Sequence, residues 1–208
     1  MKRKEKQKAV KNGAVGRLVE KASQYNELAS ISEITRRSFG NNAFDGILTM
    51  IGVLIGSMTA GVSDARIVIT TGLSTSIAIM ISGAWGAYLT ESSERRKELI
   101  EMGRSTLTDL KHTSIGRASR FAVLAVSVVD GFSPFVGSII VLMPFFFAAM
   151  FPDIRSVYFT ALAAALVALF ALGIWLGHVG RENLVAYGLK TLLAGVVSII
   201  IGSLLQFK

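Results

Sequence analysis

Five long apolar runs, separated by shorter polar stretches, dominate the pattern of hydrophobic and polar positions along the chain. A helix needs about 20 residues to cross the roughly 30 Å hydrocarbon core of a membrane. The runs lack the alternation of β-strands, and lipid cannot pair free backbone groups, so a barrel is excluded. The pattern predicts an all-α membrane domain over residues 41–208, with five transmembrane helices at about 44–62, 67–89, 121–151, 157–176 and 184–207.

The third run is longer than one span requires, and it contains Pro134 and Pro144. Proline cannot donate a backbone hydrogen bond and clashes with the carbonyl four residues earlier, so we expect a kink or a break. Pro134 in particular cannot donate the helical hydrogen bond to the carbonyl of Asp130.

Composition agrees with a membrane protein and narrows the chemistry. Hydrophobic residues make up 51% of the 208 residues and charged residues only 17%, which does not suit a water-facing surface. Cysteine is absent, which excludes disulfides, thiolate metal sites and a cysteine nucleophile. The isolated His112 and His178 favour neither a zinc site nor a histidine triad. Without a phosphate loop or dinucleotide fingerprint, no resident cofactor is expected.

Basic residues lie almost entirely on one side of the five-span pattern. The chain has 22 Lys and Arg against 14 Asp and Glu, a net charge of +8. Most basic residues precede the first span or lie in the link at 90–118, whereas the loops on the other side contain only Arg66 and Arg155. Because basic loops stay in the cytoplasm, we expect a cytoplasmic N-terminus and an external C-terminus.

Residues 1–40 form a basic segment before the first span. Within it, residues 14–34 place apolar side chains near helical spacing with charged residues between them, which predicts an amphipathic helix on the cytoplasmic membrane surface. Such a segment could also bind nucleic acid. Five spans make membrane lipids the better partner, and we expect no nucleic acid.

Two acidic residues fall inside the predicted spans, Asp45 at the start of the first and Asp130 in the third. A charged residue at a helix centre costs roughly 2.5–3.5 kcal/mol on insertion scales, so function is the default hypothesis. Asp45 shares a stripe with Gly52 and Gly56, and it should point into the protein because small residues let another helix approach. The carboxylate and carbonyl oxygens of Asp130 could converge on a hard cation.

Both acids also have structural alternatives. Asp45 could cap the first span at the interface, where a helix N-terminus favours negative charge. Asp130 could be a hydrogen-bonded or protonated acid that stabilises the kink. An internal D-G-x5-G repeat, which starts at Asp45 and again at Asp130, nevertheless suggests coupled sites at a repeat interface, as in many transporters.

Further candidate metal ligands follow on the second span. Met80 is a possible soft ligand. Beyond the span, a helix without a breaker should place four carboxylates on one face, where they could attract divalent cations: Glu91, Glu94, Glu98 and Glu101. The alternative is a solvated, ion-paired helix face, because arginine and lysine residues lie at suitable spacing.

Several of these features resemble the vacuolar iron transporter family over residues 38–208. The first span opens with Asn41-Asn42-Ala43-Phe44-Asp45-Gly46, and the third has a proline near its outer end. The second span ends with Gly86-Ala87-Tyr88 followed by Ser92-Ser93-Glu94-Arg95. The C-terminal part contains Gly188-Leu189-Lys190, Leu192-Leu193-Ala194-Gly195 and Ile201-Gly202.

The resemblance implies a homodimer that exports Fe2+, and often Mn2+, from the cytosol in exchange for protons. The family's aspartate on the first span matches Asp45. Where the family has a methionine and a glutamate on the second span, this chain has Gly83 and Ala87, for which Asp130 and Met80 are possible replacements. The family's large cytoplasmic metal-binding domain is absent, since the link has only about 28 residues.

We therefore expect a divalent metal transporter rather than an enzyme, in a prokaryotic cell membrane. The cytoplasmic glutamates would gather the ion, and Asp45 and Asp130 would bind it in the membrane. Two alternatives are a scaffold with structural acids and a metal-dependent enzyme that acts on lipid headgroups.

Overall fold

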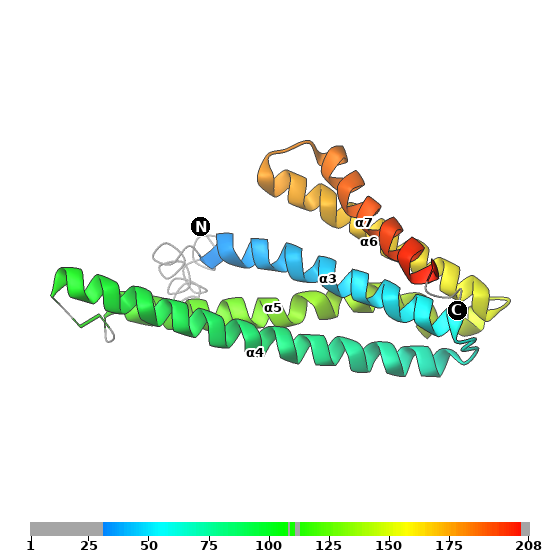
Figure 1. Cartoon of the computed structure of the whole chain (residues 1–208), viewed down its shortest axis with the longest axis horizontal. Coiled ribbons are helices and arrows are strands. Elements are labelled where there is room, and N and C mark those ends of the chain that lie inside the picture. Colours follow the sequence, from blue (N-terminus) through cyan, green and yellow to red (C-terminus); the bar gives the residue numbers. More distant parts are fainter. Residues whose placement is uncertain (1–30, 108, 111–112, 205–208) are drawn as a thin grey trace, which may run out of the picture. The chain divides into compact units, whose positions relative to one another are not determined.

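The computed structural model describes residues 31–107, 109–110 and 113–204, and helices with no strand make up this part of the chain (Figure 1). Five helices are long and apolar enough to cross a membrane. This confirms the predicted all-α, five-span architecture of an integral multi-pass membrane protein. The order is α3 (Ile31–Thr59), α4 (Ala65–Thr106), α5 (Ser114–Phe146), a short 3-10 helix η1 (Ala148–Met150), α6 (Ile154–Gly180) and α7 (Leu184–Leu204).

The predicted amphipathic helix at 14–34 lies outside the described residues, apart from 31–34, which belong to α3. Thus α3 begins well before the apolar run at Phe44. Because no proline interrupts residues 31–43, the helix can continue through the polar sequence before the span.

Helix α4 has 42 residues and extends well past its apolar run. At a rise of roughly 1.5 Å per residue it is about 63 Å long, about twice the thickness of a membrane's hydrocarbon core. The helix stops before Leu107, which has a positive φ of 52°. The part from Thr90 onward is the continuous helix that the sequence predicts, and it extends to Thr106 rather than Met102.

Helix α5 contains both prolines, and neither Pro134 nor Pro144 breaks it. The helix instead ends at Phe146, two residues after Pro144. There the amide of Phe147 donates to the Pro144 carbonyl at 3.1 Å, and η1 follows. The single span predicted at 121–151 is therefore an α-helix that ends in a tighter turn.

The described residues form two compact units: unit 1 contains 31–36 and the described part of 85–128, and unit 2 contains 37–84 and 129–204. The buried core of unit 2 draws side chains from α3, α4, α5 and α6, such as Leu54, Val68, Leu142 and Tyr158. The Tyr158 ring meets Phe145 edge-on with centroids 5.0 Å apart, and its hydroxyl donates to the Val62 carbonyl at 3.1 Å. Tyr158 thus fixes the start of α6 against α5 and the α3–α4 loop.

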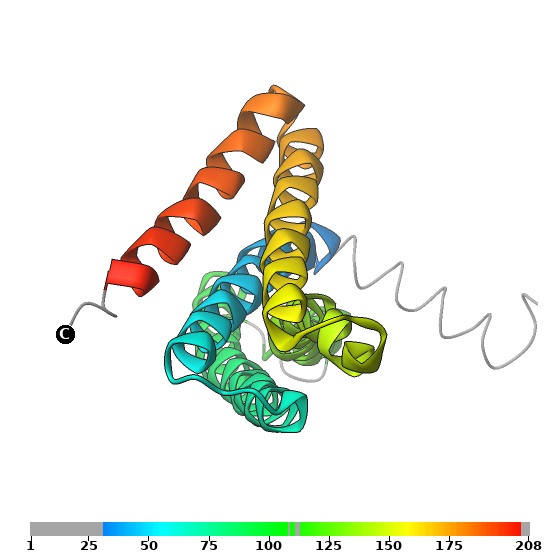
Figure 2. The ribbon, with the colours of Figure 1, turned by 90° about the vertical axis from the view of Figure 1, so that its right-hand side faces the viewer.

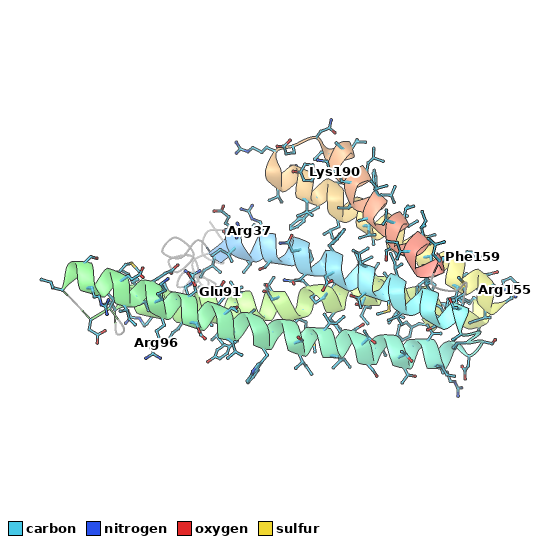
Figure 3. The ribbon with its side chains drawn as sticks, viewed as in Figure 1. Arg37, Glu91, Arg96, Arg155, Phe159 and Lys190 are labelled. Atoms are coloured by element: carbon cyan, nitrogen blue, oxygen red, sulfur yellow. The ribbon has the colours of Figure 1, made fainter. Side chains whose placement is uncertain are left out.

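Within unit 2, α3 and α6 run in opposite directions, with Arg37 and Arg155 labelled near opposite ends (Figure 3). Helices α6 and α7 pack against each other as a hairpin (Figure 2). The hairpin is close because Gly173 faces Gly188, and a Cβ on Gly173 would lie 2.7 Å from the Gly188 Cα. The Thr191 hydroxyl also donates to the Leu169 carbonyl at 2.8 Å.

Candidate functional site

A cavity of about 420 Å³ lies between three helices of unit 2. Both acids predicted from the sequence line it, although 85 positions separate them in the chain. Asp45 comes from α3 and Asp130 from α5. The other lining residues are small or polar for the most part: Asn42 from α3, Ala78, Ile79, Ser82 and Gly83 from α4, and Pro134 from α5.

Close contact between α4 and α5 fixes the position of Asp130. A Cβ on Gly83 would lie 2.9 Å from the carbonyl oxygen of Asp130, and a Cβ on Gly131 would lie 2.7 Å from the carbonyl oxygen of Met80. Real side chains do not tolerate such distances from a rigid backbone, so only glycine fits at either position. The carbonyl that Pro134 cannot bond therefore faces the backbone of α4.

A second close crossing, between α3 and α5, fixes the position of Asp45. A Cβ on Gly46 would overlap the backbone of Pro134, and a Cβ on Gly137 would lie 2.6 Å from the Ala43 carbonyl oxygen. The Ser138 hydroxyl donates to the Gly46 carbonyl at 3.2 Å and is fully buried. Helix α5 is thus bonded to α3 next to the acid.

These crossings give the repeated Asp-Gly pair a physical meaning. In both copies the glycine directly after the acid lies at a backbone-to-backbone crossing, which orients the acid toward the same cavity. The last glycines of the two D-G-x5-G copies differ. Gly137 is packed against α3, whereas a Cβ on Gly52 would meet nothing within 4 Å.

The two acids differ in exposure. Asp130 is partly buried and its Oδ1 atom is buried, whereas Asp45 is exposed. Asp45 thus lines the cavity, but a single chain does not enclose it. Its stripe on α3 is open, since a Cβ on Gly52 or Gly56 would contact no other group.

Met80 lies at the α4–α5 crossing through its main-chain carbonyl, and it is not among the residues that line the cavity. The cavity instead gains two polar residues that the sequence reasoning missed, Asn42 and Ser82. Asn42 precedes Asp45 by three residues, a spacing that puts both on one helix face and could have revealed it. Ser82 could be found only by knowing how α4 turns toward α5.

The four glutamates beyond the second span belong to unit 1. Arg95 lies between two of them, with its Nε 3.4 Å from Glu91 Oε2 and its Nη1 3.8 Å from Glu98 Oε2. Glu94 and Glu101 are exposed. In the part of the chain that the structure describes, no three His, Cys, Asp or Glu side chains gather into a cluster that could hold a metal ion. The geometry of this helix face fits the alternative to a metal site, a solvated face with ion pairs.

The two positions at which the sequence departs from the resemblance, Gly83 and Ala87, lie in different surroundings. A side chain at Gly83 would collide with the Asp130 carbonyl, and Ala87 is 8% exposed. In this packing Gly83 has no room for a methionine. The glycine that replaces the family's methionine at position 83 is therefore the residue that lets α4 approach the Asp130 carbonyl.

Two comparisons with known proteins agree with the resemblance. Residues 39–112, which include Asp45 and the whole of α4, match the sequence profile of the VIT family. The chain is also 31% identical over 160 residues to the uncharacterized protein MJ0645 of Methanocaldococcus jannaschii, an alignment that covers 76% of this chain and 80% of that protein. The chain thus belongs to the VIT family, whose membership suggests a membrane metal transporter.

Proposed function

We propose that this protein exports a divalent cation, Fe2+ or Mn2+, from the cytosol in exchange for protons, and that Asp45 and Asp130 hold the ion. The observation that carries this proposal is the convergence of two acids from different membrane helices on one cavity of about 420 Å³. The cation is cargo, bound and released in each cycle.

The cavity offers suitable chemistry for such an ion. Two carboxylates can balance a divalent charge, and oxygen ligands suit hard cations. The side-chain oxygens of Asn42 and Ser82 are further ligands on the same wall. When the ion leaves, an unpaired carboxylate in the membrane is costly, and a proton removes that cost. Metal release would therefore be coupled to proton uptake by the same groups.

A second copy of the chain completes this proposal. Asp45 is exposed and the stripe of Gly52 and Gly56 beside it is open. Of the apolar window of α4 only 17% is buried, against 50% for α5. A homodimer packed through the open faces of α3 and α4 would cover the small-residue stripe and exclude lipid from Asp45.

The direction of transport rests on the charge asymmetry of the sequence. The basic N-terminal residues and the basic link favour a cytoplasmic position for the N-terminus and for the glutamates of α4. Glu94 and Glu101, which are exposed, would then raise the local cation concentration on the side from which the ion enters.

The test is a flux measurement in liposomes that contain a metal-sensitive dye and a pH dye. Wild-type protein should admit Fe2+ or Mn2+ with opposite proton movement, and Asp45→Asn and Asp130→Asn should each strongly reduce both signals. Asp64→Asn is the matched control, because Asp64 is an exposed acid in the α3–α4 loop and does not line the cavity. Unchanged flux in both cavity variants would refute the site and favour a scaffold with structural acids.

A further inference from the structure

A second cavity, of about 780 Å³, lies in unit 1 between the outer part of α4, the connection that follows it and the first turns of α5. Its walls are apolar for the most part, with side chains such as Leu99, Ile100 and Val123. Four arginines also line it: Arg95, Arg96, Arg104 and Arg120. Asp109 is the one acid among its lining residues. The transport proposal does not involve this cavity.

The cavity spans the border between the apolar and polar parts of two membrane helices. The apolar run of α4 ends near Leu89, and that of α5 begins at Phe121. Tyr88 and Leu124 therefore line the cavity from the apolar side, where they are 43% and 58% exposed. Arg96 and Arg120 line it from the polar side. A ligand here would contact hydrocarbon-facing and water-facing residues together.

The arginines of this cavity carry charge that the described residues do not neutralise. Arg95 is shared between Glu91 and Glu98. Arg96, Arg104 and Arg120 are exposed, and within residues 31–107, 109–110 and 113–204 none of the three forms an ion pair. Guanidinium groups bind phosphate through paired, charge-assisted hydrogen bonds and are easier to desolvate than ammonium groups.

Size and polarity select the kind of phosphate compound. The volume lies within the range of about 300–1,000 Å³ that is usual for small-molecule sites, and a lone inorganic ion would leave the apolar walls uncovered. A phospholipid fits both the polar and the apolar walls of the cavity, because its phosphate can bind the arginines and its acyl chains can pack on the exposed apolar side chains. A membrane protein is surrounded by such ligands.

We propose that this cavity binds an anionic phospholipid, with the phosphate held by Arg96, Arg104 and Arg120 and the acyl chains lying along Tyr88 and Leu124. The assignment is independent of whether the protein transports metal. It gives the connection between α4 and α5 a lipid that is bound at a defined site, distinct from the annulus of lipid around the spans.

The test is native mass spectrometry of the purified full-length protein after exposure to equal amounts of phosphatidylglycerol and phosphatidylcholine. Wild-type protein should retain phosphatidylglycerol in preference. The variant Arg96→Gln with Arg120→Gln should lose this preference by on the order of tenfold, because each basic residue near anionic lipid contributes a severalfold gain. The matched control is Lys97→Gln with Arg117→Gln, which removes the same charge from neighbouring positions that do not line the cavity.

A second variant tests the apolar half of the site. Leu124→Ser leaves every charge in place and changes an exposed side chain, so folding should be unaffected, and phosphatidylglycerol retention should fall severalfold. Equal losses in the lining and control arginine variants would overturn the proposal, since they would mean only a diffuse attraction to the basic surface. Displacement of the lipid by an equal concentration of glycerol phosphate would also overturn it, by showing that a free phosphate compound suffices.

Discussion

The two cavities of this protein both use α4 and α5, yet they are built in different ways. The smaller one has two carboxylates whose positions are set by backbone contacts at glycine. The larger one has arginines on long and mostly exposed side chains, set among apolar walls. Function at the first should therefore depend on backbone geometry, and binding at the second on the number of charges.

Neutralising the acids should have the largest effect. We expect Asp45→Asn or Asp130→Asn to lower metal flux by roughly 100-fold, since even groups that only orient metal ligands contribute 10–100-fold. If one ion needs both acids, the double variant should transport no worse than the weaker single variant. Losses that multiply in the double variant would instead indicate two independent sites.

A matched pair of glycine substitutions tests the dependence on backbone geometry. Gly83→Ala places a Cβ 2.9 Å from the Asp130 carbonyl oxygen and should cost about 1–3 kcal/mol, the usual cost of overpacking. Gly52→Ala adds a Cβ in open space and should gain up to about 1 kcal/mol from helix propensity. Thermal unfolding in detergent measures both. Equal shifts for the two variants would contradict the close crossing.

Lipid binding at the larger cavity and metal flux through the smaller one should respond differently to ionic strength. Raising salt from 0.1 to 1 M shortens the Debye length from about 10 to 3 Å. Retention of phosphatidylglycerol, which depends on exposed arginines, should fall severalfold in a lipid-binding titration. Metal flux at saturating ion should change less than twofold, because direct contacts between a ligand and its ion are shorter than the Debye length even at 1 M salt. A stronger salt effect on flux than on lipid retention would reverse the comparison.

A substitution at an acid outside both cavities should have the smallest effect. Asp153 caps α6, and its hydrogen bonds with Ser156 are the main cause that lowers its pKa below the usual 3.8. Because the folded-state pKa is depressed, its stabilising contribution is fully present above the unfolded-state pKa and is lost as the pH falls through the lowered folded-state pKa. Asp153→Asn should leave flux unchanged and shift the Tm at pH 7 by about 2 °C or less, as scanning calorimetry would show.

Much of the fold could be predicted because lipid imposes it. Continuous apolar runs specify the spans, and the cost of a charge in hydrocarbon singles out Asp45 and Asp130. The contacts at Gly83 and Gly131 could not be predicted, since the sequence does not show whether a glycine in a membrane helix faces another helix or open space. Gly52 lies on the open side, and only the packed structure separates the two cases.

The arginine-lined cavity was hidden for a related reason. From the sequence, Arg96 and Arg120 are only basic residues next to two separate spans, which help to orient the chain in the membrane. Their convergence depends on the path of the chain between α4 and α5, where Leu107 adopts positive φ. Likewise, Arg95 reads as one of several possible partners for the glutamates, and only the structure shows that it lies between Glu91 and Glu98.

The glycine crossings also bear on the speed of the protein. Where backbone meets backbone at Gly46 and Pro134, and at Gly83 and Asp130, the two crossings contain no side chain whose rotation could open a path. Passage between the helices at these crossings must then open by displacement of whole helices, which takes microseconds to milliseconds, whereas rotamers exchange in nanoseconds or less. Each such displacement admits one occupant of the cavity, so the turnover number is bounded by helix motion at roughly 10³–10⁶ per second. Each transport cycle should therefore move a fixed number of ions, and the electrical current through a single molecule should be too small to resolve.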